Sequence, residues 1–172
     1  MKFTVEKNTL LKSLSHVQSI VEKKNTLPIL SNILLDAKEN SLILSATDMD
    51  ISITEKLNCN IIEEGSTTVS AHTLYDIIRK LPDTSEIEII SNDGKIISLR
   101  SGKSKFSLGC LPKKDFPIIE ISDLEIEINI DSHKFLRLMD KTRFAISNEE
   151  TRYFLNGIYF HKKKEDHSNL LS

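Results

Sequence analysis

The chain has 172 residues, of which 39% are hydrophobic and 28% charged, and its formal net charge is −2. This composition is typical of a folded protein and excludes wholesale disorder, while the near-neutral charge means that nucleic-acid binding would have to come from the distribution of charge. Residues 1–6 alternate polar and apolar side chains, and no window holds the roughly 18 apolar residues that a membrane helix needs. We therefore expect a soluble, cytoplasmic protein.

The first 60 residues predict a strand, a helix and three further strands. Residues 2–6 alternate like a strand, and Asn8 or Thr9 can cap a helix whose apolar side chains recur every three or four residues to about Lys23. Extended runs follow at 30–37, 40–46 and 49–58, separated by polar turns. Together these segments form one βαβββ unit.

A second βαβββ unit follows directly. It comprises a strand at 66–70, a helix at 73–81, and strands at 86–91, 95–100 and 104–109. We therefore expect a complete α+β domain over residues 1–120, built from two βαβββ halves. Its core should include Phe3, Val5, Leu10, Leu14, Val17, Leu34, Leu44, Ile77, Ile78 and Leu99.

The sequence then repeats itself at an offset of 125 residues, after a proline-containing linker region at 111–124. Val5, Leu10, Leu11, Lys12 and Leu14 recur as Ile130, Phe135, Leu136, Arg137 and Met139, and Leu30, Ile33 and Leu35 recur as Leu155, Ile158 and Phe160. So long a period indicates tandem domains, because solenoid repeats run at about 20 to 50 residues. We expect a strand at 125–130, a helix from Asp131 or Ser132 to about Ser147, and a truncated second domain over 121–172.

Catalysis finds little support in the sequence. Gly102-Lys103-Ser104 resembles the end of a phosphate-binding loop, but Ile97 stands where the motif requires glycine, and strands flank it where a helix should follow. Asp48 and Asp50 are more typical of a turn than of a metal site. Cys59 and Cys110 lack metal-ligand spacing and are expected to be reduced, packed thiols. We expect no catalytic residue, no metal and no cofactor.

The predicted helices carry most of the clustered positive charge. The basic residues are Lys7, Lys12, His16, Lys23 and Lys24 in and after the first helix, Arg79 and Lys80 in the second, and Lys134, Arg137, Lys141 and Arg143 in the third. If these helices line one side of a curved assembly, they form a phosphate-facing surface. The competing interpretation, favoured by charge alone, is that these residues are the solvated faces of amphipathic helices.

Several motifs in order resemble one family over residues 1 to about 160. They are Met1-Lys2-Phe3-Thr4-Val5, Thr26-Leu27-Pro28-Ile29-Leu30, Ala46-Thr47-Asp48, the segment from Ser101 to Leu108, Asp115-Phe116-Pro117 and the segment from Arg152 to Gly157. The chain thus resembles the bacterial sliding clamp, the beta subunit of DNA polymerase III.

This resemblance implies a fold and a function. The expected fold is the DNA clamp fold, with tandem domains of two βαβββ halves each, helices inside and sheets outside, and two subunits of three domains closing head to tail around duplex DNA. The expected function is that of a processivity factor, which is not an enzyme. Its implied partners are double-stranded DNA, bound without sequence preference, DNA polymerase III, the clamp loader and a second subunit.

The resemblance also assigns residues. Lys24 and the segment with Asn148, Glu149, Arg152, Tyr153 and Phe154 match DNA-contacting positions. Glu149 places an acid where relatives often carry a neutral side chain, and Phe154 lacks the hydroxyl of a tyrosine. Phe106 and Leu108 match the apolar face between subunits, with Lys103 and Lys105 beside them. Leu155 matches a contributor to the pocket that binds partner peptides.

Two other functions stay open at this point. The chain could be a short interaction module that regulates a full-length clamp or its loader through an intact first domain. An enzyme acting on nucleic acid is the third hypothesis, which lacks a metal or nucleophile constellation in the sequence.

Overall fold

The computed structural model describes residues 1–22, 26–83, 85–118, 129–147 and 149–161, without the side chains of Glu150 and Tyr153. The chain divides into two compact units, Met1–Glu120 (unit 1) and Ile121–Ser172 (unit 2). Within the described ranges, no helix is both long and apolar enough to cross a membrane.

Unit 1 contains both expected series of a strand, a helix and three strands. The first series is β1 (Lys2–Glu6), α1 (Lys7–Val17), β2 (Asn32–Lys38), β3 (Ser41–Thr47) and β4 (Ser52–Asn58). The second is β6 (Gly65–Ser70), α2 (Ala71–Lys80), β7 (Glu86–Ser91), β8 (Ile96–Ser101) and β9 (Ser104–Leu111). An additional short strand, β5 (Asn60–Glu63), lies between the two series and was not expected. The short 3-10 turns of unit 1 are η1 (Gln18–Ile20), η2 (Pro28–Ser31) and η3 (Lys113–Asp115).

The expected bounds of the first helix are wrong at both ends. The N-cap is Glu6, whose extended backbone ends β1, and not Asn8 or Thr9. After Val17 the backbone tightens into η1, and Val21 is extended with φ −83° and ψ 116°. The hydroxyls of Ser15 and Ser19 donate to the carbonyls of Lys12 and His16, which weakens helix continuation because side-chain bonds to the backbone compete with helical ones.

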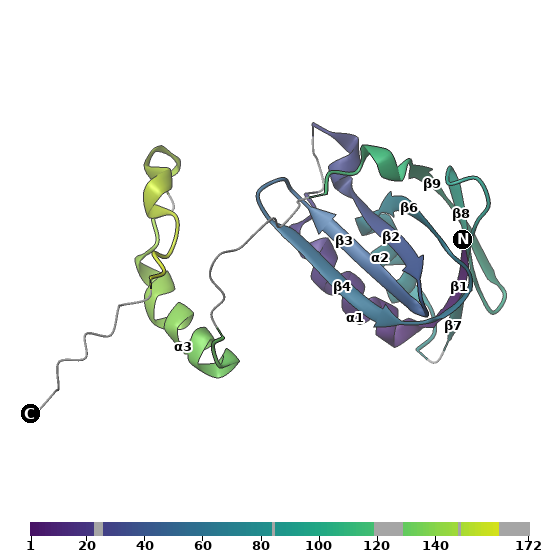
Figure 1. Cartoon of the computed structure of the whole chain (residues 1–172), viewed down its shortest axis with the longest axis horizontal. Coiled ribbons are helices and arrows are strands. Elements are labelled where there is room, and N and C mark those ends of the chain that lie inside the picture. Colours follow the sequence, from purple (N-terminus) through teal and green to yellow (C-terminus); the bar gives the residue numbers. More distant parts are fainter. Residues whose placement is uncertain (23–25, 84, 119–128, 148, 162–172) are drawn as a thin grey trace, which may run out of the picture. The chain divides into compact units, whose positions relative to one another are not determined.

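Nine strands of the described residues form one antiparallel sheet in the order β4-β3-β2-β6-β9-β8-β7-β1-β5. The two series exchange their first strands. β1 pairs with β7 of the second series, and β6 pairs with β2 of the first. Helices α1 and α2 pack against each other on one face of these strands (Figure 1).

The core lies between the two helices and the sheet. Eight of the ten expected core residues, among them Phe3, Leu14 and Ile78, belong to one buried cluster. Leu34 is buried but lies outside this cluster, and Ile77 is only half-buried at its border. Each fully buried Leu, Ile or Phe side chain contributes about 1.5 to 3 kcal/mol, so this cluster is the main stabilising feature of unit 1.

Unit 2 repeats the helical part of unit 1. Helix α3 (Ser132–Thr142) and the turn η4 (Arg143–Ala145) begin and end 125 residues after α1 and η1. The expected cap at Asp131 is confirmed, since its carboxylate accepts from the Lys134 N–H at 3.0 Å. The helix ends at Thr142, earlier than expected, for η4 tightens the backbone there. Of the expected strand at 125–130, residues 125–128 lie outside the described ranges, and residues 129–130 are not in a strand.

Candidate nucleic-acid and subunit interfaces

The helical face of unit 1 carries exposed basic side chains. They are Lys12 and His16 on α1 and Arg79 and Lys80 on α2. His16 Nδ1 lies 2.8 Å from Glu55 Oε1, and Arg79 pairs with Asp76 at 3.2 Å while its guanidinium lies over the Tyr75 ring. Two of these four side chains therefore have an acidic neighbour, which reduces the attraction of this face for phosphate.

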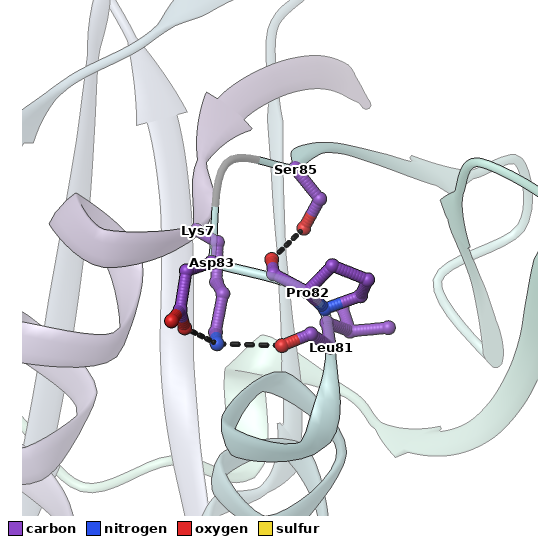
Figure 2. A network of polar contacts seen from close by, with 5 residues as sticks. All are labelled: Lys7, Leu81, Pro82, Asp83 and Ser85. Carbon is purple, nitrogen blue, oxygen red and sulfur yellow. Dashed lines mark hydrogen bonds and ion pairs between the residues drawn. The ribbon is translucent and has the colours of Figure 1, made fainter.

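Lys7 does not belong to this basic face, which corrects the expectation from sequence. Its side chain is only 3% exposed, and its ammonium donates to the Leu81 carbonyl at 2.6 Å and to Asp83 Oδ1 at 2.7 Å (Figure 2). The hydrogen bond and then the charge of Lys7 hold the pKa of Asp83 below its ordinary value of 3.8. Lys7 is thus a structural cation that cannot contact phosphate in this fold.

The second expected DNA-contacting segment lies in unit 2, on the turn η5 (Glu150–Leu155) and the residue before it. Arg152 pairs with Glu149 at 3.2 Å, so the acid noted in the sequence engages the base of the same segment. Phe154 is 71% exposed. Lys24 and Asn148 lie outside the described residues, as does the side chain of Tyr153.

Leu155, the expected contributor to a partner pocket, lies at the end of the same turn. Its carbonyl accepts from the Ser147 N–H at 3.0 Å, and its side chain is 45% exposed. This hydrogen bond brings Ser147 and Leu155 together at the two ends of a loop. An exposed leucine on a closed loop is available for contact with a partner.

The four expected interface residues lie together on the β8–β9 hairpin. Gly102 forms its turn with φ +54°, a backbone conformation that favours glycine. Lys103 and Lys105 are exposed, whereas Phe106 and Leu108 are half-buried against the core cluster, opposite Leu99 and Ile97 of β8. Because successive side chains of a strand point to opposite faces, Lys105 lies on the solvent face of the hairpin, and Phe106 and Leu108 lie on the face toward the core.

β9 also offers a backbone edge. Its residues 104–109 pair with β8 on one side, but β6 pairs only with Cys110 and Leu111 on the other. Within the described residues, the remaining edge of β9 has no strand partner. Such an edge can accept a further strand by main-chain hydrogen bonds.

A groove of about 430 Å³ lies between α2 and β9. Its lining includes Ile77, Lys80, Leu81, Pro82, Ser104 and Phe106. Sequence reasoning identified Phe106 but missed the wall formed by Leu81 and Pro82. The groove (the α2–β9 groove) combines an apolar surface with an adjacent sheet edge.

The other motifs are structural in unit 1. Asp48 Oδ1 accepts from the N–H groups of Asp50 and Ile51, and the bond from Ile51 is the larger cause that lowers the pKa of Asp48. Gly102-Lys103-Ser104 forms the β8–β9 turn, so no helix follows it. Cys59 and Cys110 are free and packed against the core, where burial raises the pKa of both thiols. Within the described residues, no cluster of metal-ligating side chains is found.

Comparison with known proteins gives a consistent result. The family model for the N-terminal domain of the DNA polymerase III beta subunit matches residues 1–120. The Beta sliding clamp of Caulobacter vibrioides is 49% identical over 166 residues, which span 96% of this chain and 45% of that protein. The Beta sliding clamp of Escherichia coli K12 is 37% identical over 167 residues, again 96% of this chain and 45% of the relative.

Solved structures agree with these matches. The structure of Caulobacter crescentus pol III beta has a TM-score of 0.91 at 48% identity and covers 97% of this chain and 45% of its own. A sliding clamp from Bartonella birtlesii bound to griselimycin has a TM-score of 0.90 at 48% identity, covering 94% of this chain and 43% of its own. The expected α+β clamp fold is confirmed, and the chain spans somewhat less than half the length of the relatives it matches.

Proposed function

The chain belongs to the family of the DNA polymerase III beta subunit, the bacterial sliding clamps, and on this premise we propose that it forms the N-terminal portion of a DNA sliding clamp. In the complete protein, this portion encircles duplex DNA with the rest of the ring and tethers the replicative polymerase. It supplies no catalysis and works in the cytoplasm. The observation that carries the proposal is the likeness to solved clamps over nearly the whole chain.

The same likeness supports a proposal for the domain organisation. We assign residues 1–120 to a complete first clamp domain and residues 121–172 to the start of a second. The repetition of α1 and η1 by α3 and η4 at a constant offset supports this assignment. The helix layer of the first domain is the side that we assign to the DNA.

The DNA contacts should be mobile and independent of sequence, since a ring that slides gains nothing from reading bases. We assign them to Lys24 and to the segment with Asn148, Glu149, Arg152, Tyr153 and Phe154. The ion pair between Glu149 and Arg152 should weaken the second set, because it holds the guanidinium against a carboxylate of its own chain.

The subunit contact is assigned to the α2–β9 groove and the free edge of β9. Phe106 and Leu108 supply its apolar part, and Lys103 and Lys105 are available for ion pairs with the next subunit. This arrangement supports a head-to-tail homodimer of the full-length protein. Leu155 is assigned to the pocket that receives peptides from the polymerase and the clamp loader.

A second candidate function rests on the position of this interface. The groove and the strand edge lie wholly within unit 1. A short clamp-related protein that keeps unit 1 could bind a full-length clamp and regulate its assembly or loading. The leading proposal differs in requiring the DNA contacts that we assign to Lys24 and to the segment with Arg152.

Duplex binding by the 172-residue chain tests the leading proposal. We expect weak binding, with a dissociation constant of about 10⁻⁴ M or higher at physiological salt. The affinity should fall steeply as the salt concentration rises, because the contacts neutralise phosphate. Lys24→Ala should weaken binding equally for all sequences, whereas Glu149→Gln should strengthen it modestly by releasing Arg152. Fluorescence anisotropy of labelled duplexes of several sequences measures these changes.

Lys103→Ala is the matched control, since it removes a lysine from the hairpin and not from the helix layer; its binding should be unchanged. The Caulobacter clamp loaded on circular DNA should by contrast resist salt and leave only when the circle is cut. Tight binding of the 172-residue chain at high salt, or a preference for one sequence, would overturn the proposal.

A further inference from the structure

Lys7 joins two segments that are far apart in the sequence. Its ammonium donates to the Leu81 carbonyl and to the Asp83 carboxylate (Figure 2). Its own backbone N–H donates to the Ser85 carbonyl at 3.0 Å. The first residue of α1 therefore holds the loop that follows α2. No other side chain drawn in this network reaches from one helix to the other.

The chemistry of the loop explains why a cation lies there. Leu81 is the C-cap of α2, with an extended backbone, so its carbonyl has no partner within the helix. The negative end of the helix dipole and the Asp83 carboxylate both favour a positive charge at this point. A buried ammonium is tolerated only when it is bonded in this way, which makes its position well defined.

The loop that Lys7 holds is also a wall of the α2–β9 groove. Leu81 and Pro82 line the groove together with Phe106 and Ser104 of β9. Ser85 closes the other end of the loop, since its hydroxyl donates to the Pro82 carbonyl at 2.7 Å. The position of the Leu81–Pro82 wall relative to Phe106 is therefore fixed by the ammonium of Lys7 on one side and by Ser85 on the other.

We propose that Lys7 is a positioning residue for the subunit interface. By holding the Leu81–Pro82 wall, it keeps the α2–β9 groove open at the width that a neighbouring subunit requires, although Lys7 itself is buried and does not line the groove. This inference rests on the proposed function, because it assumes that the groove receives the next subunit.

A second lysine–aspartate pair provides a matched comparison. Lys113 donates to Asp36 Oδ2 at 3.0 Å, joining η3 to β2. Neither residue lines the α2–β9 groove. Loss of this pair should lower the stability of unit 1 without changing the groove.

The experiment measures association of the 172-residue chain with the full-length Caulobacter clamp by native mass spectrometry, in which the two proteins have different masses. Phe106→Ala should weaken the mixed complex, and Lys7→Met should weaken it about tenfold, as expected when a buried carbonyl loses its donor. Lys7→Arg should retain most of the binding. Lys113→Met should retain all of it, even if its melting temperature falls.

Asp83→Ala covers the case in which Lys7→Met fails to fold. Asp83 is 87% exposed, so its loss should leave the fold intact and weaken the complex only about twofold. If Phe106→Ala weakens the complex while Lys7→Met and Asp83→Ala do not, the positioning role is wrong. If Lys7→Met and Lys113→Met weaken it equally, the effect is general destabilisation. If the unsubstituted chain forms no complex, or Phe106→Ala has no effect, the assignment of the interface itself is wrong.

Discussion

Asp83 shows how a single neighbour changes the titration of an otherwise exposed group. Its carboxylate is 2.7 Å from the Lys7 ammonium, and this contact lowers its pKa from the ordinary value of 3.8. A carboxyl group whose pKa is lower in the folded state stabilises the protein above its unfolded-state pKa. That contribution is lost as the pH falls through the folded-state pKa.

Asp83→Asn should therefore lower the free energy of unfolding at neutral pH and have progressively less effect below about pH 3.8. At the acid limit both proteins carry an uncharged side chain at this position, so their stabilities should converge. Urea denaturation of both proteins at a series of pH values measures the difference. A difference that grows toward low pH would contradict this linkage.

The burial of Lys7 was not predicted, because the expected helix began only after Asn8 or Thr9, whereas α1 begins at Lys7. Lys7 lies three residues before Leu10 and seven before Leu14, in phase with the buried face of α1. Sequence reasoning counted it with the basic residues because charged side chains are usually exposed. Its acceptors at Leu81 and Asp83 come from a loop more than 70 residues away, which no local pattern reveals.

Among the elements, those with clear periodicity were predicted well. The strands around Ile87 and Leu99 and the helix around Leu74 and Ile78 were located to within two residues at most ends. β5 was missed because four residues, Asn60–Glu63, give too short a pattern, and only Cys59 and Glu64 separate them from the neighbouring strands. β5 forms by pairing with β1, and a local sequence pattern does not predict such long-range pairing.

Helix α3 differs from α1 in what covers its apolar face. Leu10 and Leu14 of α1 are fully buried, whereas Phe135 is 40% and Leu136 is 59% exposed. Phe160 gives Phe135 one edge-on ring contact, with centroids 6.1 Å apart. A helix of 11 residues is marginal in water without a packed face, so α3 should open readily in the isolated chain.

Hydrogen exchange should separate the two units. Amides of α3 should exchange fast, through local opening of the helix. Amides of β2 and β3 should exchange slowly, only through global unfolding of unit 1. Amide exchange of the monomeric 172-residue chain, followed by NMR, measures both. Equal protection of α3 and β2 in a monomer would show that unit 2 has a stable fold of its own.

For unit 1 as a whole, the exchange of first strands joins the two βαβββ halves. β1 lies beside β7, and β6 lies beside β2, so neither half has a complete sheet of its own. Side chains from both series also share one core cluster. The sequence predicted two similar halves, but it could not predict that they share strands, since either pairing satisfies the same alternation of apolar residues.

Unit 1 should consequently unfold in one cooperative step. In a urea titration, NMR signals from β3 and from β8 should disappear with the same midpoint, because loss of either half removes strands from the other. Leu44→Ala in β3, a fully buried position, should lower both midpoints together, with a loss of about 2 to 5 kcal/mol. Separate midpoints for the two sets of signals would indicate that the halves are independent.

The pairing of β1 with β5 affects the order in which β1 finds its partners during translation. The Met1 ammonium donates to the carbonyl of Ser91, which lies 90 residues later in the sequence. β7 can therefore pair with β1 only after most of unit 1 has left the ribosome. β5 is synthesised well before β7, and its register places Ile61 against Phe3. β5 is thus the strand partner of β1 that is synthesised first. It covers one edge of β1 before β7 is available to pair with the other edge.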